Sequence, residues 1–272
     1  MQSRVRKVVL ITGAGSGIGA ATARRLADEG HQIVLADIDA ERVRNVAADV
    51  GHEALAVPLD IRSVEQWNTT LDLVWSRFGR LDVLINNAGI IHTGYVRDVS
   101  IDEHRRTLEV NYLGPLIGMK QTLPRFQAQG SGHFVTVCSM TAFLPMPGMA
   151  SYAGTKHALR AFHHTLALEE RKGPLKFSIV HPPSTETGML EQELSDDSTA
   201  LAFSEKSVSA DFVASKIMRV VHDQPSEVVM PAGFGQFLRL FGATTGIMRL
   251  MVDHAEAKGR RVQAALRKNR HG

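Results

Sequence analysis

A tyrosine and a lysine four residues apart, Tyr152 and Lys156, stand out in the 272-residue chain. On a helix this spacing puts both side chains on one face. Tyrosine has a pKa near 10 in water and is a poor base at neutral pH. A cation about 4 Å away, at an effective dielectric near 20, would stabilise the tyrosinate by about 4 kcal/mol and lower that pKa by about 3 units. The pair could then transfer a proton in alcohol oxidation or carbonyl reduction. Taken alone, the spacing also fits an exposed helix pair.

A hydroxyl and a glycine loop extend this chemistry. Ser139 lies 13 residues before Tyr152 at the end of a predicted strand, where it could hydrogen-bond a substrate oxygen. Gly13, Gly17 and Gly19 lie in the run TGAGSGIG between a strand pattern and a helix pattern. Glycines there permit positive φ and let backbone N–H groups approach a pyrophosphate. The spacing is not G-x-G-x-x-G, so a simple turn remains an alternative.

The residue that ends the second predicted strand bears on the choice of cofactor. Asp37 follows the glycine loop by roughly 20 residues, where a carboxylate can accept from an adenosine ribose hydroxyl. The same charge would repel a 2′-phosphate, so the sequence favours NAD over NADP. Arg42 and Arg44 keep NADP open, although a surface-helix role fits both.

Strand and helix patterns alternate along the chain. Short apolar runs predict strands at 5–11, 31–37, 53–58, 81–85, 133–138, 176–181 and 227–230. Helix patterns cover 20–29, 40–50, 63–78 (with Ser63 as N-cap and Gly79 after its end), 101–128, 151–172 and 209–223. Such alternation predicts an α/β domain with right-handed crossovers and a parallel sheet covered on both faces. We expect one domain, 1–235, followed by a helical extension, 236–272.

Taken together, these motifs resemble the short-chain dehydrogenase/reductase family. The matching segments are TGAGSGIG at 12–19, Asn86-Asn87-Ala88-Gly89, Asn111, Ser139 and Tyr152-Ala153-Gly154-Thr155-Lys156. They occur in order and at family spacing between residue 5 and about 230. The resemblance implies a doubly wound Rossmann sheet of about seven strands in the order 3-2-1-4-5-6-7, and an Asn-Ser-Tyr-Lys tetrad.

The resemblance also implies a role for each matching residue. Tyr152 would be the general acid/base, and Ser139 would hold the reacting oxygen. Lys156 would grip the nicotinamide ribose and lower the Tyr152 pKa, and Asn111 would hold a relay water or, alternatively, make a helix hydrogen bond. Asp60 would meet the adenine or cap the helix at 63–78. The residues expected around the cofactor are Gly13, Ser16, Gly17, Ile18, Gly19, Asp37, Asp60, Ile61, Asn87, Ala88, Gly89, Tyr152, Lys156, Pro182, Thr185 and Thr187.

One segment departs from the family pattern. The family has Pro-Gly after its sixth strand, then an apolar residue and a threonine that reach the carboxamide. Here Pro183 replaces the glycine, fixes φ near −65° and removes an N–H. Thr185 replaces the apolar residue, and Thr187 keeps its place. The departure puts the geometry of nicotinamide binding in question.

Apolar side chains flank the tetrad, which points to a lipophilic substrate. Methionine adapts to irregular apolar shapes, and core filling is the competing interpretation. The expected substrate is a lipophilic secondary alcohol or ketone. The segment 188–208 shows few core signals and is expected to form a mobile lid. The apolar residues concerned are Phe143, Leu144, Met146, Met149, Met189, Leu190 and Leu194.

Composition excludes several classes of protein. No apolar run approaches the roughly 20 residues of a membrane-spanning helix, and the N-terminal apolar run is too short for a signal peptide. The single cysteine, Cys138, excludes a disulfide framework. The 12 histidines show no metal-ligand spacing, so no metal is expected. These features predict a cytoplasmic protein.

Positive charge is concentrated in the tail. Residues 236–272 hold eight Lys or Arg against two Asp or Glu, a net +6, while the rest of the chain is at −3. Two tail helices are expected, at 236–241 and 247–266. They could pack on the domain or on a sister subunit, cover the pocket, or dock on an anionic membrane; no nucleic-acid partner is expected.

Three functions are therefore compared. The leading one is an NAD(H)-dependent oxidoreductase, expected from the resemblance to form a homodimer or homotetramer. The alternatives are an NADP(H)-dependent carbonyl reductase and a non-catalytic dinucleotide sensor. An intact tetrad argues against the sensor, which has no need of an activated tyrosine.

Overall fold

The computed structural model describes residues 6–51, 53–230 and 245–271, with side chains described up to residue 268 and, within the C-terminal helix, from residue 252. The tail helix predicted at 236–241 lies outside the described residues. Among those described, parallel strands form a seven-stranded sheet in the order β3-β2-β1-β4-β5-β6-β9. These are β1 (Val8–Thr12), β2 (Gln32–Asp37), β3 (Leu55–Pro58), β4 (Val83–Asn86), β5 (His133–Val137), β6 (Lys176–His181) and β9 (Glu227–Val229). The predicted order is confirmed, with β9 as its seventh strand.

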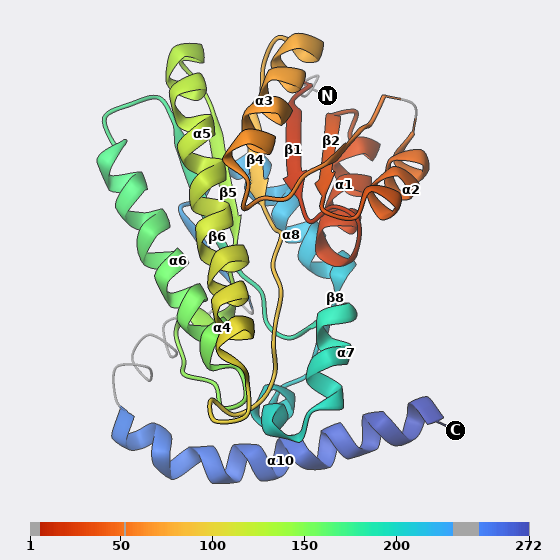
Figure 1. Ribbon diagram of the computed structural model, residues 1–272, viewed down its shortest axis with the longest axis vertical. Coiled ribbons are helices and arrows are strands. Elements are labelled where there is room, and N and C mark those ends of the chain that lie inside the picture. The colour runs from red at the N-terminus through yellow and green to blue at the C-terminus, as the bar shows by residue number, and fades with distance from the viewer. Residues whose placement is uncertain (1–5, 52, 231–244, 272) are drawn as a thin grey trace.

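Helices cover both faces of this sheet (Figure 1). One face carries α1 (Gly17–Asp28), α2 (Ala40–Val50) and α8 (Ala210–Asp223). The other carries α3 (Val64–Phe78), α4 (Ile101–Leu108), α5 (Gly114–Gln129) and α6 (Ala150–Glu169). Two cores result: Leu26, Val43 and Ile217 pack against the first face, and Trp67, Leu71 and Phe126 against the second. The strands read as continuous apolar runs because they are buried on both faces.

Several predicted boundaries change by a few residues. The helix predicted from Ala20 begins at Gly17, because Ser16 already serves as the N-cap. Strand β4 begins at Val83 rather than Leu81. The helix predicted over 101–128 contains a π-helical turn, η1 (Glu109–Leu113), between α4 and α5. Ser63 caps α3 and Gly79 ends it, as predicted.

The segment after β6, which shows few core signals in the sequence, forms regular structure with a small core of its own. It holds β7 (Thr185–Glu186), α7 (Gly188–Ser195), the 3₁₀ segment η3 (Asp197–Ser204) and β8 (Val208–Ser209), which pairs with β7. Leu190, Leu194 and Phe203 form a small buried cluster. The long helix α10 (Thr245–His271) runs across η3 and α7 at the end of the molecule (Figure 1). We call α7 and η3 together the lid; its predicted mobility stays a prediction.

Candidate active site

The glycine loop between β1 and α1 forms an anion cradle. Its backbone takes positive φ at Gly13 (65°) and Gly17 (52°), a conformation that favours glycine. A Cβ at Gly19 would lie 2.2 Å from the Gly13 carbonyl oxygen. Ser16 caps α1 without a side-chain hydrogen bond, so no capping side chain covers the first N–H groups of the helix. The loop therefore fits the pyrophosphate of a dinucleotide.

Asp37 ends β2 beside this loop. Its carboxylate accepts from the Gly15 N–H (2.9 Å) and from the Asp39 N–H (3.0 Å). The side chain also lines the large cavity, and so does that of Arg42, whose Nε lies 3.2 Å from Asp39 Oδ2. Asp37 and Arg42, one arginine of the NADP alternative, therefore line the same cavity, and the role of Asp37 as ribose acceptor stays a prediction.

The turn after β4 is tied to the glycine loop by hydrogen bonds. Asn87 Nδ2 donates to the carbonyls of Thr12 (3.0 Å) and Gly13 (3.1 Å). The N–H groups of Asn87 and Ala88 donate to Thr12 Oγ1 (3.1 and 3.2 Å). Asn87, Ala88 and Gly89 line the cavity as expected. Sequence reasoning does not single out Thr12; its one signal is its place at a strand end before the first glycine.

Asp60 and Ile61 line the cavity after β3. Capping of α3 by Asp60 is wrong, because Ser63 accepts from the Gln66 N–H (3.2 Å). Asp60 instead accepts from the Arg62 backbone N–H (3.0 Å) and from its guanidinium (2.6–3.1 Å). The Arg62 guanidinium holds the pKa of Asp60 below its usual value.

Ser139 lies just past β5, and a partly buried charge cluster supports it. Its Oγ accepts from the Thr141 N–H (3.1 Å), and its carbonyl accepts from His181 Nδ1 (2.9 Å). Glu227 Oε1 lies 3.0 Å from His181 Nε2 and 2.9 Å from Arg160 Nε. Although burial opposes the charge, hydrogen bonds with Cys138 and Glu227 raise the pKa of His181 to about 9. Sequence reasoning missed this cluster, whose members lie up to 67 residues apart.

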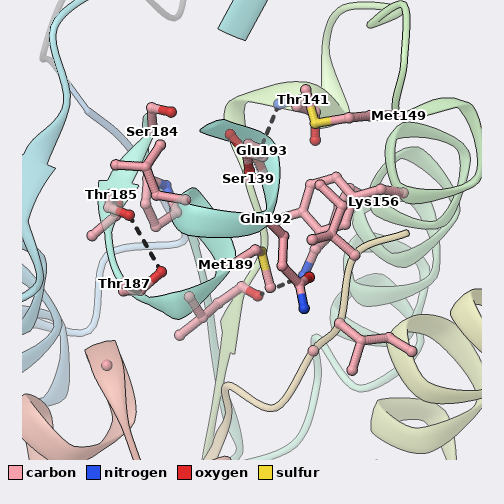
Figure 2. Close-up of a pocket in the computed structure, with 18 of the residues that line it drawn as sticks. Ser139, Thr141, Met149, Lys156, Ser184, Thr185, Thr187, Met189, Gln192 and Glu193 are labelled. Atoms are coloured by element: carbon pink, nitrogen blue, oxygen red, sulfur yellow. Dashed lines mark hydrogen bonds between the residues drawn. The ribbon is translucent and has the colours of Figure 1, made fainter. Parts of the chain in front are cut away.

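Tyr152 and Lys156 lie on α6 and line the cavity with Ser139; Figure 2 labels Lys156 and Ser139. Lys156 Nζ lies 5.4 Å from the centre of the Tyr152 ring and donates to the Val137 carbonyl (3.4 Å). Both side chains are buried. The predicted pair is thus inside the cavity rather than on an exposed helix face.

The electrostatics of Tyr152 differ from the expectation. Burial raises its pKa, the Glu193 carboxylate raises it further, and a hydrogen bond with Ser139 opposes both effects. Burial also lowers the pKa of Lys156. Desolvation thus dominates the pKa of Tyr152 in the chain by itself, and the lowering of that pKa by Lys156 stays a prediction.

Asn111 lies in the π-helical turn and is fully buried. Its Oδ1 accepts from the Ile90 N–H (2.8 Å), and its Nδ2 donates to the Ile90 carbonyl (2.8 Å). The alternative of a hydrogen bond within its own helix does not describe these contacts. Asn111 Oδ1 would lie 3.3 Å from a Cβ placed at Gly89, so it packs just behind the cavity wall. Its role in a water relay stays a prediction.

The departing segment after β6 also reaches the cavity. Pro182, Pro183, Thr185 and Thr187 line it. Thr185 Oγ1 donates to the Pro183 carbonyl (2.8 Å), and Thr187 Oγ1 donates to the Thr185 carbonyl (3.3 Å). Pro183 does not adopt a positive φ. A Cβ at Gly17 would lie 3.0 Å from Thr187 Cγ2, so Thr187 closes over the glycine loop.

Of the residues expected at the site, all but Gly19 and Asn111 line one cavity of about 1150 Å³. Its substrate end has walls of Met146, Met149, Met189 and Leu190. Figure 2 shows Met189, Gln192 and Glu193 on α7 at this end. Val252 and Ala255 of α10 complete the lining. Covering of the pocket was one of the alternatives for the tail, whereas Gln192 and Glu193 were not identified as pocket residues.

A group of possible metal ligands lies elsewhere. The ligand atoms of Glu29, His31 and His222 are all within 4.8 Å of one another. None of the three lines the cavity. His31 Nδ1 accepts from the Lys7 N–H (3.2 Å), so the proton of a neutral ring sits on Nε2, the nitrogen that lies 3.7 Å from Glu29.

A parallel sheet with a glycine cradle, a ribose acceptor and a Ser–Tyr–Lys group defines a dinucleotide-dependent oxidoreductase of the Rossmann class. The sequence profile for short chain dehydrogenases matches residues 7–198. The chain belongs to the short-chain dehydrogenase family, as the resemblance implied.

Named relatives and a solved structure agree with this placement. Trans-4-hydroxycyclohexanecarboxylate dehydrogenase of Sinomonas cyclohexanicum is 35% identical over 67% of this chain and 74% of its own. 2,5-Dichloro-2,5-cyclohexadiene-1,4-diol dehydrogenase LinX of Sphingobium indicum is 37% identical over 60% of this chain, and the match spans 66% of LinX, just under two thirds of its length. A short-chain dehydrogenase/reductase of Burkholderia phymatum, solved with NAD, superposes with a TM-score of 0.80 at 25% identity, over 88% of this chain and 94% of its own.

Proposed function

We propose that the protein is an NAD(H)-dependent oxidoreductase that interconverts lipophilic secondary alcohols and ketones. The observation that carries the proposal is a single cavity lined by the glycine cradle, by Asp37 and by Ser139, Tyr152 and Lys156. NAD(H) would supply the hydride transfer, which side chains cannot perform. The glycine loop would hold its pyrophosphate, Asp37 its adenosine ribose and Lys156 its nicotinamide ribose.

The raised pKa of Tyr152 assigns its resting state. At neutral pH the hydroxyl is protonated and can donate to a carbonyl oxygen during reduction, while Ser139 hydrogen-bonds the same oxygen. In oxidation Tyr152 must first lose its own proton to solvent, and the resulting tyrosinate then takes the proton of the substrate hydroxyl. Lys156, on the same helix face, would stabilise that tyrosinate, and the cluster of His181, Glu227 and Arg160 would hold the Ser139 backbone in place.

The choice of NAD over NADP rests on Asp37. A carboxylate that accepts from two backbone N–H groups is held at the cavity wall, where it would repel a 2′-phosphate. Arg42 supports the NADP alternative, but its guanidinium already pairs with Asp39. Rates with both cofactors decide the point.

A lipophilic, ring-shaped substrate is supported by the walls and by relatives. Methionine and leucine side chains from three elements surround the substrate end, and such walls adapt to irregular apolar ligands. The names of the two relatives above describe alcohols on six-membered rings. We therefore infer cyclic secondary alcohols as the substrate class.

Replacing the tyrosine tests the proposal. Tyr152→Phe should lower turnover of a cyclic alcohol and NAD⁺ by at least about 100-fold, because it removes the proton-transfer group. NADH binding, followed by fluorescence, should stay the same. Tyr112→Phe is the matched control, since Tyr112 packs edge-on against Phe162 and does not line the cavity. Unchanged turnover in Tyr152→Phe would favour a different mechanism, and binding without any turnover in the wild type would favour the sensor.

Assembly and location complete the proposal. We propose a homodimer or homotetramer in the cytoplasm, following the resemblance.

No helix among the described residues is long and apolar enough to cross a membrane. In α10, Lys258, Arg260 and Arg267 pair with Glu205, Glu256 and Asp197. Docking of the tail on an anionic membrane stays a prediction, to be tested by salt-sensitive vesicle binding.

A further inference from the structure

A buried carboxyl lies at the substrate end of the cavity. Glu193, near the end of α7, is only 9% exposed and is one of the residues that line the cavity. Its neighbours on that wall include Met189 and Leu190, and Figure 2 shows it on the helix that crosses above Ser139. An acidic side chain among apolar walls requires an explanation, because burying a carboxyl without a partner costs free energy.

The protein itself supplies no partner for this carboxyl among the residues that the structure describes. No hydrogen bond or ion pair involves its side chain there, although its backbone is firmly held. Burial alone raises the pKa of Glu193 to about 7. Both protonation states of the carboxyl are therefore accessible near neutral pH, and a bound ligand can change the balance between them.

The backbone of Glu193 is held by hydrogen bonds on the side away from the cavity. Its carbonyl accepts from Thr199 Oγ1 (2.6 Å) in the lid and from Gln263 Nε2 (3.2 Å) in α10. Gln263 is itself 2% exposed, so this support is buried. In front, the carboxylate acts on Tyr152 and raises the pKa of that hydroxyl. Glu193 is thus anchored within electrostatic reach of the reacting centre.

We propose that Glu193 is a specificity-determining residue that binds a second hydroxyl group of the substrate, so that diols and hydroxyketones are preferred over monofunctional alcohols. The inference rests on the proposed function and deepens it. A hydroxyl can donate to a carboxylate and can also accept from a carboxylic acid, so it suits either protonation state. An ammonium group suits only the ionised state and would add a second cation to a cavity that already holds Lys156.

Paired substrates test the proposal with NAD⁺. Cyclohexanol is compared with cyclohexane-1,4-diol, and a monohydroxysteroid with its dihydroxy counterpart. The wild type should prefer each diol by at least about tenfold in kcat/KM, since a site built to bind a hydroxyl rejects analogues that lack one. In Glu193→Met the ratio of kcat/KM for each diol to that for its monofunctional partner, both measured in the same variant, should fall to about one. In Glu193→Gln, whose amide can still hydrogen-bond, part of the preference should remain.

Glu191→Gln is the matched control, because it removes one charge from the exposed side of the same helix, outside the cavity. It should leave the preference unchanged. Glu193→Met should fold at least as well as the wild type, since it replaces an unpaired buried acid by an apolar side chain, and its thermal midpoint checks this.

The possible failures are distinct. An equal diol preference in the wild type and in Glu193→Met would overturn the role of Glu193 while the oxidoreductase stands. A preference for 4-aminocyclohexanol over the diol would overturn the choice of hydroxyl. No turnover of any alcohol or ketone by the wild type would overturn the proposed function as well.

Discussion

The two ends of the cavity are held together in different ways. At the cofactor end, β1, β2 and β4 finish side by side, and the ties run between the loops that directly follow them, such as Asn87 to Thr12 and Gly15 to Asp37. At the substrate end, the lid is held by the C-terminal helix. Gln263 Nε2 donates to the carbonyls of Leu194 and Asp196 (3.4 and 2.8 Å) as well as to Glu193, and Arg267 Nε donates to Leu194 (2.6 Å).

This difference implies that cofactor binding at one end and substrate binding at the other can be altered independently by mutation. The cofactor end depends on the register of a fully buried sheet, which alters only if the fold alters. The lid depends on a few contacts from a single helix, so its geometry can shift while the sheet stays intact. Variants in one region should therefore change cofactor binding, and variants in the other should change substrate binding.

The largest effect is expected in the glycine loop. In Gly19→Ala, the new Cβ would lie 2.2 Å from the Gly13 carbonyl oxygen, so the cradle must open. We expect NADH affinity to fall by at least about 100-fold, because pyrophosphate binding needs close backbone approach. Gly154→Ala is the control, since no atom lies within 4 Å of its Cβ position. Fluorescence titration measures both, and near-normal affinity in Gly19→Ala would contradict this account of the cradle.

The next effect is expected where α10 meets the lid. In Gly259→Ala, the Cβ would lie 1.8 Å from the Ala200 carbonyl oxygen, so the helix must move off η3. KM for the alcohol should rise by about tenfold, because the wall made by Val252 and Ala255 shifts, while NADH affinity stays the same. Ala257→Ser, at an exposed position of the same helix, is the control. If NADH affinity fell in parallel with KM, the two ends would not be separable.

An effect of similar size is expected at Asp37. Asp37→Ser removes the charge that opposes a 2′-phosphate, while a hydroxyl remains for the ribose. The ratio of kcat/KM with NADPH to that with NADH should rise by about tenfold, equivalent to about 1.4 kcal/mol. Asp49→Ser removes an exposed carboxylate of α2 instead, and the ratio should not change. A wild-type preference for NADPH would reverse the assignment.

The smallest effect is an opposite response of the two regions to pH. Burial lowers the pKa of His133 and His163, in β5 and α6, to about 3. In the unfolded chain both histidines bind a proton below about pH 6.5, whereas in the folded core they stay neutral down to about pH 3. The free energy of unfolding of the core therefore increases as pH rises from 4.5 to 6.5. Burial raises the pKa of Glu193 to about 7. The folded lid therefore keeps a proton that the unfolded chain loses near pH 4.5. The free energy of unfolding of the lid decreases over the same pH range for that reason. Each slope is at most about 1.4 kcal/mol per pH unit and group.

Hydrogen exchange of separate peptides measures this contrast. After correction for intrinsic exchange, protection should rise with pH in β5 and α6 and fall in α7. Glu193→Gln should remove the slope in the lid without changing that in the core. Slopes of the same sign in both regions would contradict the assignment.

Much of the cofactor end was predictable from the chain. Gly13, Asp37, Asp60 and Asn87 each lie in or just before the loop after a strand, and parallel strands bring their carboxyl ends to one edge. Tyr152 and Lys156 share a helix face because of their spacing. Only the contacts behind these residues were missed, such as Thr12 with Asn87 and Arg62 with Asp60.

The substrate end was not predictable in the same way. The segment 188–208 carries no long periodic pattern, and its core of Leu190, Leu194 and Phe203 forms only when α7 and η3 pack together. The contacts from Gln263 and Arg267 cross about 70 residues of chain, a separation that no local spacing reveals.

The sequence by itself determined the alternation of strands and helices, the glycine loop and the shared helix face of Tyr152 and Lys156, because these follow from local periodicity and spacing. The strand order and the grouping of Ser139 with that pair came from the family resemblance. Only the tertiary structure decided the high pKa of Tyr152, the unpaired carboxyl of Glu193 and the seat of α10 on the lid. Those properties depend on which side chains are buried from water and on which backbone carbonyls accept hydrogen bonds from distant residues. Both are set only when the chain has packed.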